Sequence, residues 1–208
     1  LITSSAASDV YKRQVEDGTA EILTILNKHK VKATFFVLGW IAKKYPELVK
    51  EIAKQGHEIA SHGYGHQTLD NISKAELDYD LKKSNEVISK ITNKPIIGYR
   101  APMGSIGDKN IWVLDVLINN GFKYDSSIYT SSLLVHSGSR HICDEITEIK
   151  KGFWEVPLSV ETYMKIPVPI SGGFYLRSLP FFLFKKLMKK RNKAKKTTVL
   201  YYHPWEFS

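Results

Sequence analysis

Two histidines four residues apart are the clearest chemical feature of the chain. They lie in the run His62-Gly63-Tyr64-Gly65-His66, and neutral imidazoles at this spacing can bind one divalent metal ion. The intervening glycines favour a loop. No glutamate follows His62, which rules out the helical pattern of zinc peptidases. At this point the alternative is a pair of histidines that caps the end of a strand through hydrogen bonds.

Three further polar clusters follow segments that have the composition of strands. They begin at Arg100, in Arg100-Ala101-Pro102-Met103-Gly104, at Asp125, and at His203. In parallel sheets, reactive residues gather beyond the carboxyl ends of the strands, so these clusters and the two histidines are expected at one edge. Each also has a simpler interpretation: an arginine paired with any carboxylate, an aspartate that caps a turn through Ser127, or a histidine at a strand end.

Other chemistries have weaker support in the sequence. The run Gly104-Ser105-Ile106-Gly107 does not match the serine-hydrolase pattern, and the sequence has no glycine-rich phosphate loop. Cys143 is the single cysteine, so an intramolecular disulfide and a four-cysteine zinc site are both excluded. We interpret Cys143 as an incidental thiol, and His57 as a residue that packs or points away from the two histidines.

Predicted helices and strands alternate along the chain. A first helix begins at Val15, and Ser73 with Glu76 predicts a capping box at the start of a later helix. Strands are predicted at 31–38, 57–61, 95–99, 122–125, 153–158 and 198–202, and the other helices at 46–55, 73–91, 110–120 and 179–196. Repeated strand-helix units predict a mainly parallel sheet, either a barrel or an open doubly wound sheet.

Length and charge limit the class of protein. The chain has 208 residues, 43% of them hydrophobic, which suits one globular domain. Its net charge of +9 is concentrated at 185–196, where we expect an amphipathic helix with a solvated basic end or a peripheral contact with an anionic membrane or glycan. Nucleic acid is not expected, because no recognition motif accompanies the charge. No apolar run reaches the length of a membrane span.

The first fourteen residues differ in character from the rest. Residues 1–14 are small and polar, then irregular, and have no basic leader followed by an apolar core. We interpret them as a foreign or disordered leader, and residues 15–208 as the folded domain. The native start would then be absent, and localisation is left between the cytoplasm and the cell envelope of a bacterium.

Taken together, the motifs resemble the NodB-homology polysaccharide deacetylases, carbohydrate esterase family 4, over residues 15–207. The resemblance rests on four runs: Val-Lys-Ala-Thr-Phe-Phe-Val from Val31, Gly-His-Glu-Ile-Ala-Ser-His-Gly-Tyr-Gly-His from Gly56, Gly-Tyr-Arg-Ala-Pro from Gly98, and Tyr-His-Pro-Trp-Glu from Tyr202. This combination is similar to a bacterial branch associated with exopolysaccharide production. The implied fold is an α/β, distorted (β/α) barrel with mainly parallel strands.

The resemblance also implies roles for individual residues. His62 and His66 would be ligands of a divalent metal, with zinc as the default. Arg100 would orient a catalytic aspartate, and the backbone N–H of Met103 would stabilise an oxyanion. Two further roles lie later in the chain: Asp125 would pair with a histidine and keep it protonated, and His203 would be the general acid.

The chain departs from the family at its front. The family carries an apolar strand ending in a Thr-Phe-Asp-Asp-like motif, which supplies the general base and the third metal ligand, and this chain has no Asp-Asp pair. Asp9 is a weak substitute, because it follows Ser-Ala-Ala-Ser rather than a strand. The resemblance therefore implies a domain that lacks its first strand, and the sequence leaves open that the fragment is inactive.

The expected function is removal of N-acetyl groups from the amino sugars of a polysaccharide or oligosaccharide by a metal-dependent hydrolase, which we expect to be a monomer. The alternative is a non-catalytic glycan-binding or scaffold protein that retains the fold. Tyr64, Trp154 and Trp205 could stack on sugar rings, although aromatic residues near sheet ends more often pack against protein.

Overall fold

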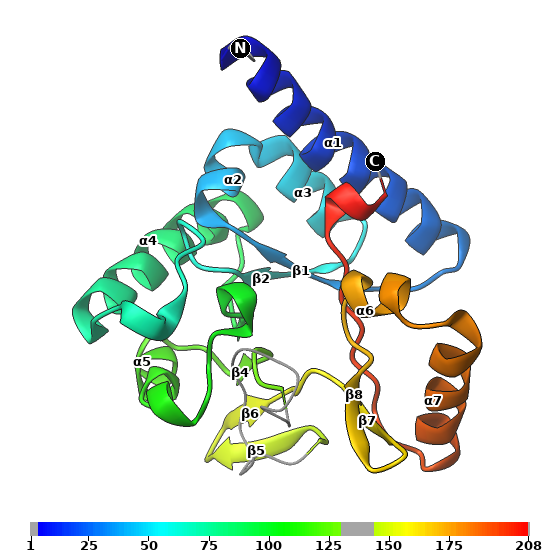
Figure 1. Ribbon diagram of the computed structural model, residues 1–208. Coiled ribbons are helices and arrows are strands. Elements are labelled where there is room, and N and C mark those ends of the chain that lie inside the picture. Colours follow the sequence, from blue (N-terminus) through cyan, green and yellow to red (C-terminus); the bar gives the residue numbers. More distant parts are fainter. Residues whose placement is uncertain (1–3, 130–143, 208) are drawn as a thin grey trace.

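The computed structural model describes the backbone of residues 4–129 and 144–207, and within these ranges the side chains from Val15 onward except that of Asn71. Its centre is a six-stranded sheet in the order β1-β2-β3-β4-β6-β5 (Figure 1). The first five strands of that order are parallel, and β5 is the antiparallel edge. Their bounds are β1 Thr34–Val37, β2 Glu58–Ser61, β3 Gly98–Tyr99, β4 Tyr124–Asp125, β5 Thr147–Lys150 and β6 Phe153–Glu155. The predicted α/β fold with mainly parallel strands is confirmed.

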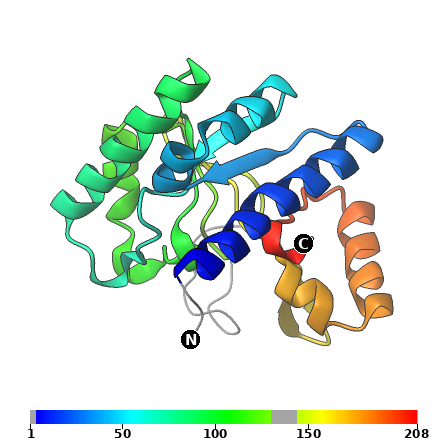
Figure 2. The same cartoon turned by 90° about the horizontal axis from the view of Figure 1, so that it is seen from above.

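Helices surround this sheet (Figures 1 and 2). They are α1 Ser4–Lys28, α2 Gly39–Lys44, α3 Pro46–Lys54, α4 Lys74–Thr92, α5 Val113–Asn119, α6 Gly173–Ser178 and α7 Phe181–Lys193. The helix that we predicted from Val15 thus begins at Ser4. The short α2 was not predicted, because its six residues are too few to show a helical period.

α4 shows why the sequence pattern gives a packed helix. Its buried residues Leu77, Leu81, Ser84 and Ile88 recur at helical spacing and face the core. The predicted capping box is present: Ser73 Oγ accepts the Glu76 N–H at 3.2 Å, and the Glu76 carboxylate accepts the Ser73 N–H at 2.9 Å. The helix ends at Asn93, whose φ of 53° lies in the left-handed region. The main core lies between this helix, its neighbours and the sheet.

The C-terminal part adds a hairpin and two helices beside the sheet. β7 Val160–Tyr163 pairs antiparallel with β8 Ile166–Pro169, and α7 packs nearby. Arg191 of α7 is fully buried and donates to the Val160 carbonyl at 3.0 Å and to the Thr197 carbonyl at 2.5 Å. One arginine therefore ties the helix to the hairpin and to the chain that follows it.

The strand predicted at 198–202 is wrong. In the structure this segment is not part of a sheet. The Val199 N–H donates to Ser159 Oγ at 2.8 Å, and the Val199 carbonyl accepts from Ser171 Oγ. Side-chain hydroxyls thus take the place of the backbone ladder of the predicted strand.

The structure describes no helix that is long and apolar enough to cross a membrane.

Replacing the cap of α4 tests how much this helix depends on its start. Ser73→Ala removes the oxygen that accepts the Glu76 N–H, and we expect the free energy of unfolding to fall by about 1 kcal/mol. Urea unfolding followed by circular dichroism measures it. Ser89→Ala, on the exposed side of the same helix, should change stability much less, and equal losses in the two variants would contradict the importance of the cap.

Candidate active site

The loop that carries the two histidines is held from two sides. β2 ends at Ser61, and the His62 N–H that follows it donates to the Val37 carbonyl at the end of β1, at 2.9 Å. Asp80 of α4 accepts hydrogen bonds from the N–H groups of Tyr64 at 2.7 Å and Gly65 at 3.3 Å. On the other side, the Gly39 N–H at the start of α2 donates to the Gly63 carbonyl at 2.9 Å. The loop is therefore fixed before any ligand binds.

Gly63 is required at its position for two reasons. Its φ is +76°, which side chains other than glycine rarely adopt. A Cβ atom there would also lie 2.8 Å from Asp80 Oδ2. The glycine that we took as a loop signal thus lets the backbone approach Asp80. We did not identify Asp80 from the sequence, because a single aspartate on a helix has no distinguishing pattern.

His62 has the geometry of an oriented ligand. Its Nδ1 lies 2.7 Å from the carbonyl oxygen of Arg100. A carbonyl can only accept, so Nδ1 carries the proton and Nε2 keeps its lone pair, as in histidines that bind metals through Nε2. Burial lowers the pKa of His62 to about 4. The imidazole is therefore neutral near pH 7, the state that a metal ligand needs.

His66 lies beside His62. The two ring centroids are 5.2 Å apart, with the ring planes at 70°. His66 has a φ of 58°, a conformation that costs free energy in residues other than glycine and that is concentrated at functional sites. The structure therefore brings the two predicted metal ligands together.

These two histidines fit a divalent ion in donor type and protonation, but they are a partial set. Among the side chains that the structure describes, from Val15 onward, no group of three His, Cys, Asp or Glu residues could hold a metal. Asp9, the weak substitute ligand, falls among the side chains outside the described ones. The described part of the chain thus supplies two ligands, whereas zinc sites usually have three or four from protein.

Arg100 lies just beyond β3, next to the histidine loop. Its Nε donates to the Ser126 carbonyl at 2.7 Å, and its Nη2 lies 2.6 Å from Ser126 Oγ. The guanidinium also covers the ring of Phe36 at 4.2 Å. Among the described residues, no carboxylate forms a salt bridge with it. The aspartate that the resemblance assigns to Arg100 is therefore not in place, and the geometry leaves this role a prediction.

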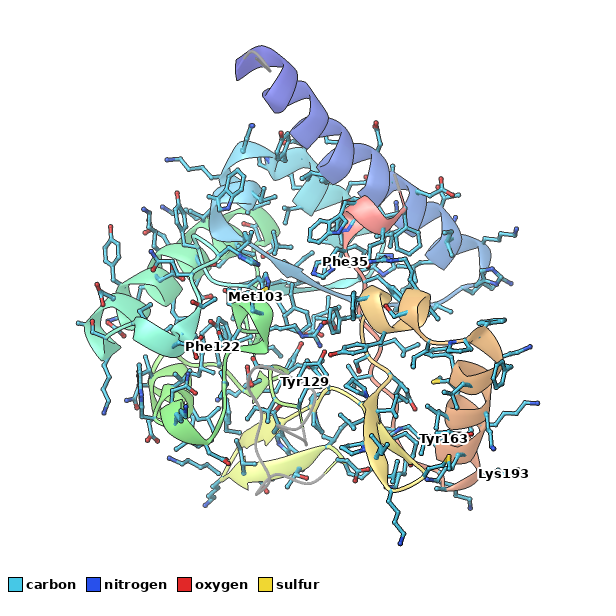
Figure 3. All side chains as sticks on the ribbon, in the orientation of Figure 1. Phe35, Met103, Phe122, Tyr129, Tyr163 and Lys193 are labelled. Atoms are coloured by element: carbon cyan, nitrogen blue, oxygen red, sulfur yellow. The ribbon has the colours of Figure 1, made fainter. Side chains whose placement is uncertain are left out.

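Met103 lies in the turn after Arg100, the 3-10 helix η2 Pro102–Gly104. Its side chain is exposed, and its φ of 57° is again left-handed. Figure 3 shows it near the centre of the view. The bend follows Arg100, whose carbonyl oxygen contacts His62, and the role of the Met103 N–H in oxyanion stabilisation stays a prediction.

Asp125 is fully buried and has partners that differ from those the resemblance implies. Its carboxylate accepts the Ser127 N–H at 3.0 Å and the Ser127 hydroxyl at 2.6 Å. Its other partner is the carboxyl group of Glu155, at the matching position of β6. Among the described residues, no histidine bonds to Asp125. The turn-capping interpretation through Ser127 therefore describes the observed contacts better than the pairing with a histidine.

Asp125 and Glu155 must share a proton. Glu155 is also fully buried, and its Oε1 accepts the Ile128 N–H at 3.2 Å. Its Oε2 has no N–H or hydroxyl partner within the described residues, which suits a protonated oxygen that donates to Asp125. Burial first, and then the charge of Asp125, raise the pKa of Glu155 well above its usual range. We did not identify Glu155 from the sequence.

His203 is held by the turn that follows it, the 3-10 helix η4 Pro204–Glu206. Its ring stacks on Trp205 with centroids 4.0 Å apart and planes at 14°. Its N–H donates to Glu206 Oε2 at 2.8 Å, and its Nδ1 lies 3.7 Å from the same oxygen. Burial lowers the pKa of His203, while the Glu206 charge opposes this effect. The carboxylate next to this histidine is thus Glu206 rather than Asp125.

Glu206 is in turn held by α6. Arg177 pairs with its Oε1, and the Glu206 side chain is only 6% exposed. A Cβ atom on Gly173 would lie 2.0 Å from that same oxygen, so the first residue of α6 has to be glycine for the carboxylate to fit. Gly18 of α1 likewise leaves room for the Pro204 carbonyl. The turn is therefore enclosed by helices from both ends of the chain.

Ring contacts connect the polar clusters into one site. Tyr201 lies 5.4 Å from the Arg100 guanidinium and 5.7 Å from the His203 ring. The charge of His203 acts on the pKa of His62, and that of His66 acts on the pKa of His203. His62, His66, Arg100 and His203 therefore share one region, as predicted. Of the three aromatic residues proposed to stack on sugars, Trp205 covers His203 and Tyr64 lies under Lys83 Nζ at 4.0 Å.

Glu155→Gln tests the shared proton. In the unfolded chain Glu155 ionises near its ordinary pKa of 4.5, whereas the folded chain keeps it protonated. Above that pH the folded state binds more protons, so this group lowers stability as pH rises, by at most about 1.4 kcal/mol per pH unit. Glutamine cannot ionise, so the variant should gain stability relative to wild type between about pH 5 and pH 7.

Urea unfolding at several pH values measures this difference. The matched control is Asp115→Asn at an exposed carboxylate, whose stability should follow the wild-type pH profile. A Glu155→Gln profile parallel to that of wild type would show that Glu155 is ionised in the folded protein.

Comparisons with known proteins bear on the family of the chain and on its fold. A family model described as "Polysaccharide deacetylase" matches residues 8–124, more than half of the chain. A second, described as "Domain of unknown function (DUF3473)", matches residues 126–208. A chitooligosaccharide deacetylase from Rhizobium leguminosarum bv. trifolii is 40% identical over 189 residues, covering 78% of this chain and 84% of the relative. A peptidoglycan deacetylase from Helicobacter pylori is 32% identical over 177 residues, covering 82% of this chain and 58% of the relative.

Structural similarity extends over nearly the whole chain. A crystal structure described as a "putative polysaccharide deacetylase from Mycobacterium smegmatis" has a TM-score of 0.70 at 25% identity, and covers 98% of this chain and 68% of that one. Against three of the curated relatives, the chain spans only 32% to 58% of their length. The sequence motifs, the α/β fold and the family model agree, and the chain belongs to the polysaccharide deacetylase family.

Proposed function

We propose that the full-length protein hydrolyses the amide bond of N-acetyl groups on amino sugars of a polysaccharide or oligosaccharide, with a divalent metal, zinc by default, held in part by His62 and His66. The observation that carries the proposal is the hydrogen bond from His62 Nδ1 to the Arg100 carbonyl at 2.7 Å. It leaves the Nε2 atom of a neutral imidazole beside His66. Relatives named as chitooligosaccharide and peptidoglycan deacetylases support this substrate class.

Each residue of the site would have a distinct part in the reaction. A bound metal would supply a Lewis acid that polarises the amide carbonyl and lowers the pKa of water. His203, stacked on Trp205, would donate a proton to the departing sugar amine. The Met103 N–H would donate a hydrogen bond to the oxyanion. Arg100 would orient a base carboxylate, which the resemblance assigns to an Asp-Asp pair that this chain does not contain.

A second function has one specific observation in its favour. The described residues hold no set of three metal-ligating side chains, as would suit a protein that binds acetylated glycans without cleaving them. The two functions predict different results with the same oligosaccharide, since only the enzyme releases acetate.

The central test is acetate release from N-acetylglucosamine oligomers by the full-length gene product. A chelator should abolish release and added zinc should restore it, while His62→Ala or His66→Ala should lower the rate on the order of 100-fold or more. His29→Ala, at an exposed position outside the site, is the matched control and should leave the rate unchanged.

Release that persists after chelation, or in both histidine variants, would refute the metal-dependent mechanism. Binding of the oligomers without any acetate release would favour the non-catalytic glycan-binding protein.

Glu206→Gln tests how His203 is used. Glutamine keeps the size of the side chain but removes the charge that opposes the lowering of the His203 pKa. We expect kcat to fall by on the order of 10- to 100-fold, a part of what a general acid contributes, and KM to change little. Steady-state kinetics checks this, with Glu21→Gln at an exposed position as control. An unchanged kcat would show that the carboxylate does not act on His203.

A further inference from the structure

The outward face of α7 combines aromatic and basic side chains. Phe181 and Phe182 at the start of the helix are 62% and 72% exposed. Exposed lysines follow them at helical spacing, namely Lys185, Lys186, Lys189, Lys190 and Lys193. The opposite side of the helix, with Phe184, Leu187 and Arg191, is buried against the hairpin. Because the opposite side of α7 is buried, the direction in which the aromatic and basic side chains point is fixed.

The charge of this face is largely uncompensated. The sequence of α7 contains no acidic residue. Lys190 is neutralised by Glu161, at 2.7 Å. Lys185 and Lys186 instead lie over the rings of Phe181 and Tyr163, at 4.8 Å and 5.2 Å. The helix thus presents several positive charges that are held next to aromatic surface.

A groove runs between this helix and the hairpin. It has a volume of about 610 Å³, and its walls include Thr162, Tyr163, Phe182 and all five lysines of the face. Figure 3 shows Tyr163 and Lys193 at the edge of the molecule, away from Met103 at the centre. A ligand of this groove would therefore not occupy the candidate active site.

We propose that the α7 face, defined as Phe181, Phe182 and the five lysines, binds the surface of an anionic phospholipid bilayer. Lysines attract anionic headgroups, and two adjacent exposed phenylalanines can enter the boundary between headgroups and acyl chains. A soluble polyanion would use the lysines but would gain little from the phenylalanines. A neutral glycan would not need the charge. The combination of both side-chain types on one fixed face favours the bilayer.

Vesicle flotation of the purified chain tests the proposal without reference to catalysis. We expect binding to vesicles that contain phosphatidylglycerol, and at least tenfold weaker binding to vesicles of phosphatidylcholine alone. The binding should weaken as salt rises from about 0.01 M to about 1 M. Changing Lys185, Lys186, Lys189 and Lys193 to Gln, or Phe181 and Phe182 to Ser, should each weaken binding about tenfold or more.

Matched variants distinguish the face from charge and apolarity in general. The control for charge changes four exposed lysines elsewhere, Lys43, Lys54, Lys109 and Lys123, to Gln. The control for apolarity is Tyr79→Ser with Ile111→Ser, at exposed positions on other elements. Both controls should bind like wild type.

Three results would overturn the proposal. These are equal binding to neutral vesicles, loss of binding in the control variants to the same extent, and full binding by the phenylalanine variant. In the last case, unaltered binding of the same variant to soluble polyglutamate would identify the face as a general polyanion site. Circular dichroism of each variant verifies that the fold is retained.

Discussion

The hydrogen bond between His62 and the Arg100 carbonyl is the constraint on which the site depends. It joins the residue after β2 to the residue after β3, two neighbouring parallel strands that pair through Ser61 and Tyr99. A shift of register by one residue would turn the side chains of the shifted strand to the opposite face of the sheet. The orientation of the imidazole is therefore a consequence of strand pairing, and the direction of its free Nε2 atom is determined by the same ladder that builds the core.

The site also contains two buried carboxyl groups that have no positively charged partner in an ion pair among the described residues. Asp125 and Glu155 are enclosed at the ends of adjacent strands, where two negative charges would be very unfavourable, so one proton is retained between them. Their acceptor oxygens hold the N–H groups of Ser127 and Ile128, and Ser126 binds Arg100. The carboxyl pair therefore shapes the backbone turn that positions the arginine.

Much of the fold could be predicted from the sequence, because long helices and buried strands carry periodic patterns. The capping box at Ser73, the strand before His62 and the helix ending near Gly121 all follow from local rules. The hairpin of β7 and β8 was missed, since its strands have four residues each and one ends at a proline. The segment at 198–202 was misassigned, because the backbone N–H and carbonyl of Val199 pair with the hydroxyls of Ser159 and Ser171, which are distant in sequence, and not with a neighbouring strand.

Some residues of the candidate site could likewise be predicted from the sequence, and others could not. The sequence identified four residues whose types are unusual at strand ends, namely His62, His66, Arg100 and His203. The structure brings these four together. Asp80, Glu155 and Arg177 were not identified, because their significance lies in contacts between residues that are far apart in sequence. Arg177 is the clearest case.

Arg177 forms an ion pair with Glu206. The Glu206 carboxylate fits beside α6 only because Gly173 has no side chain, and the turn that carries Glu206 fits beside α1 only because Gly18 has none. Each residue alone is compatible with an ordinary surface position, and no local pattern links the four. The fold makes them interdependent, and the position of the His203 imidazole follows from that packing rather than from the motif in which it lies.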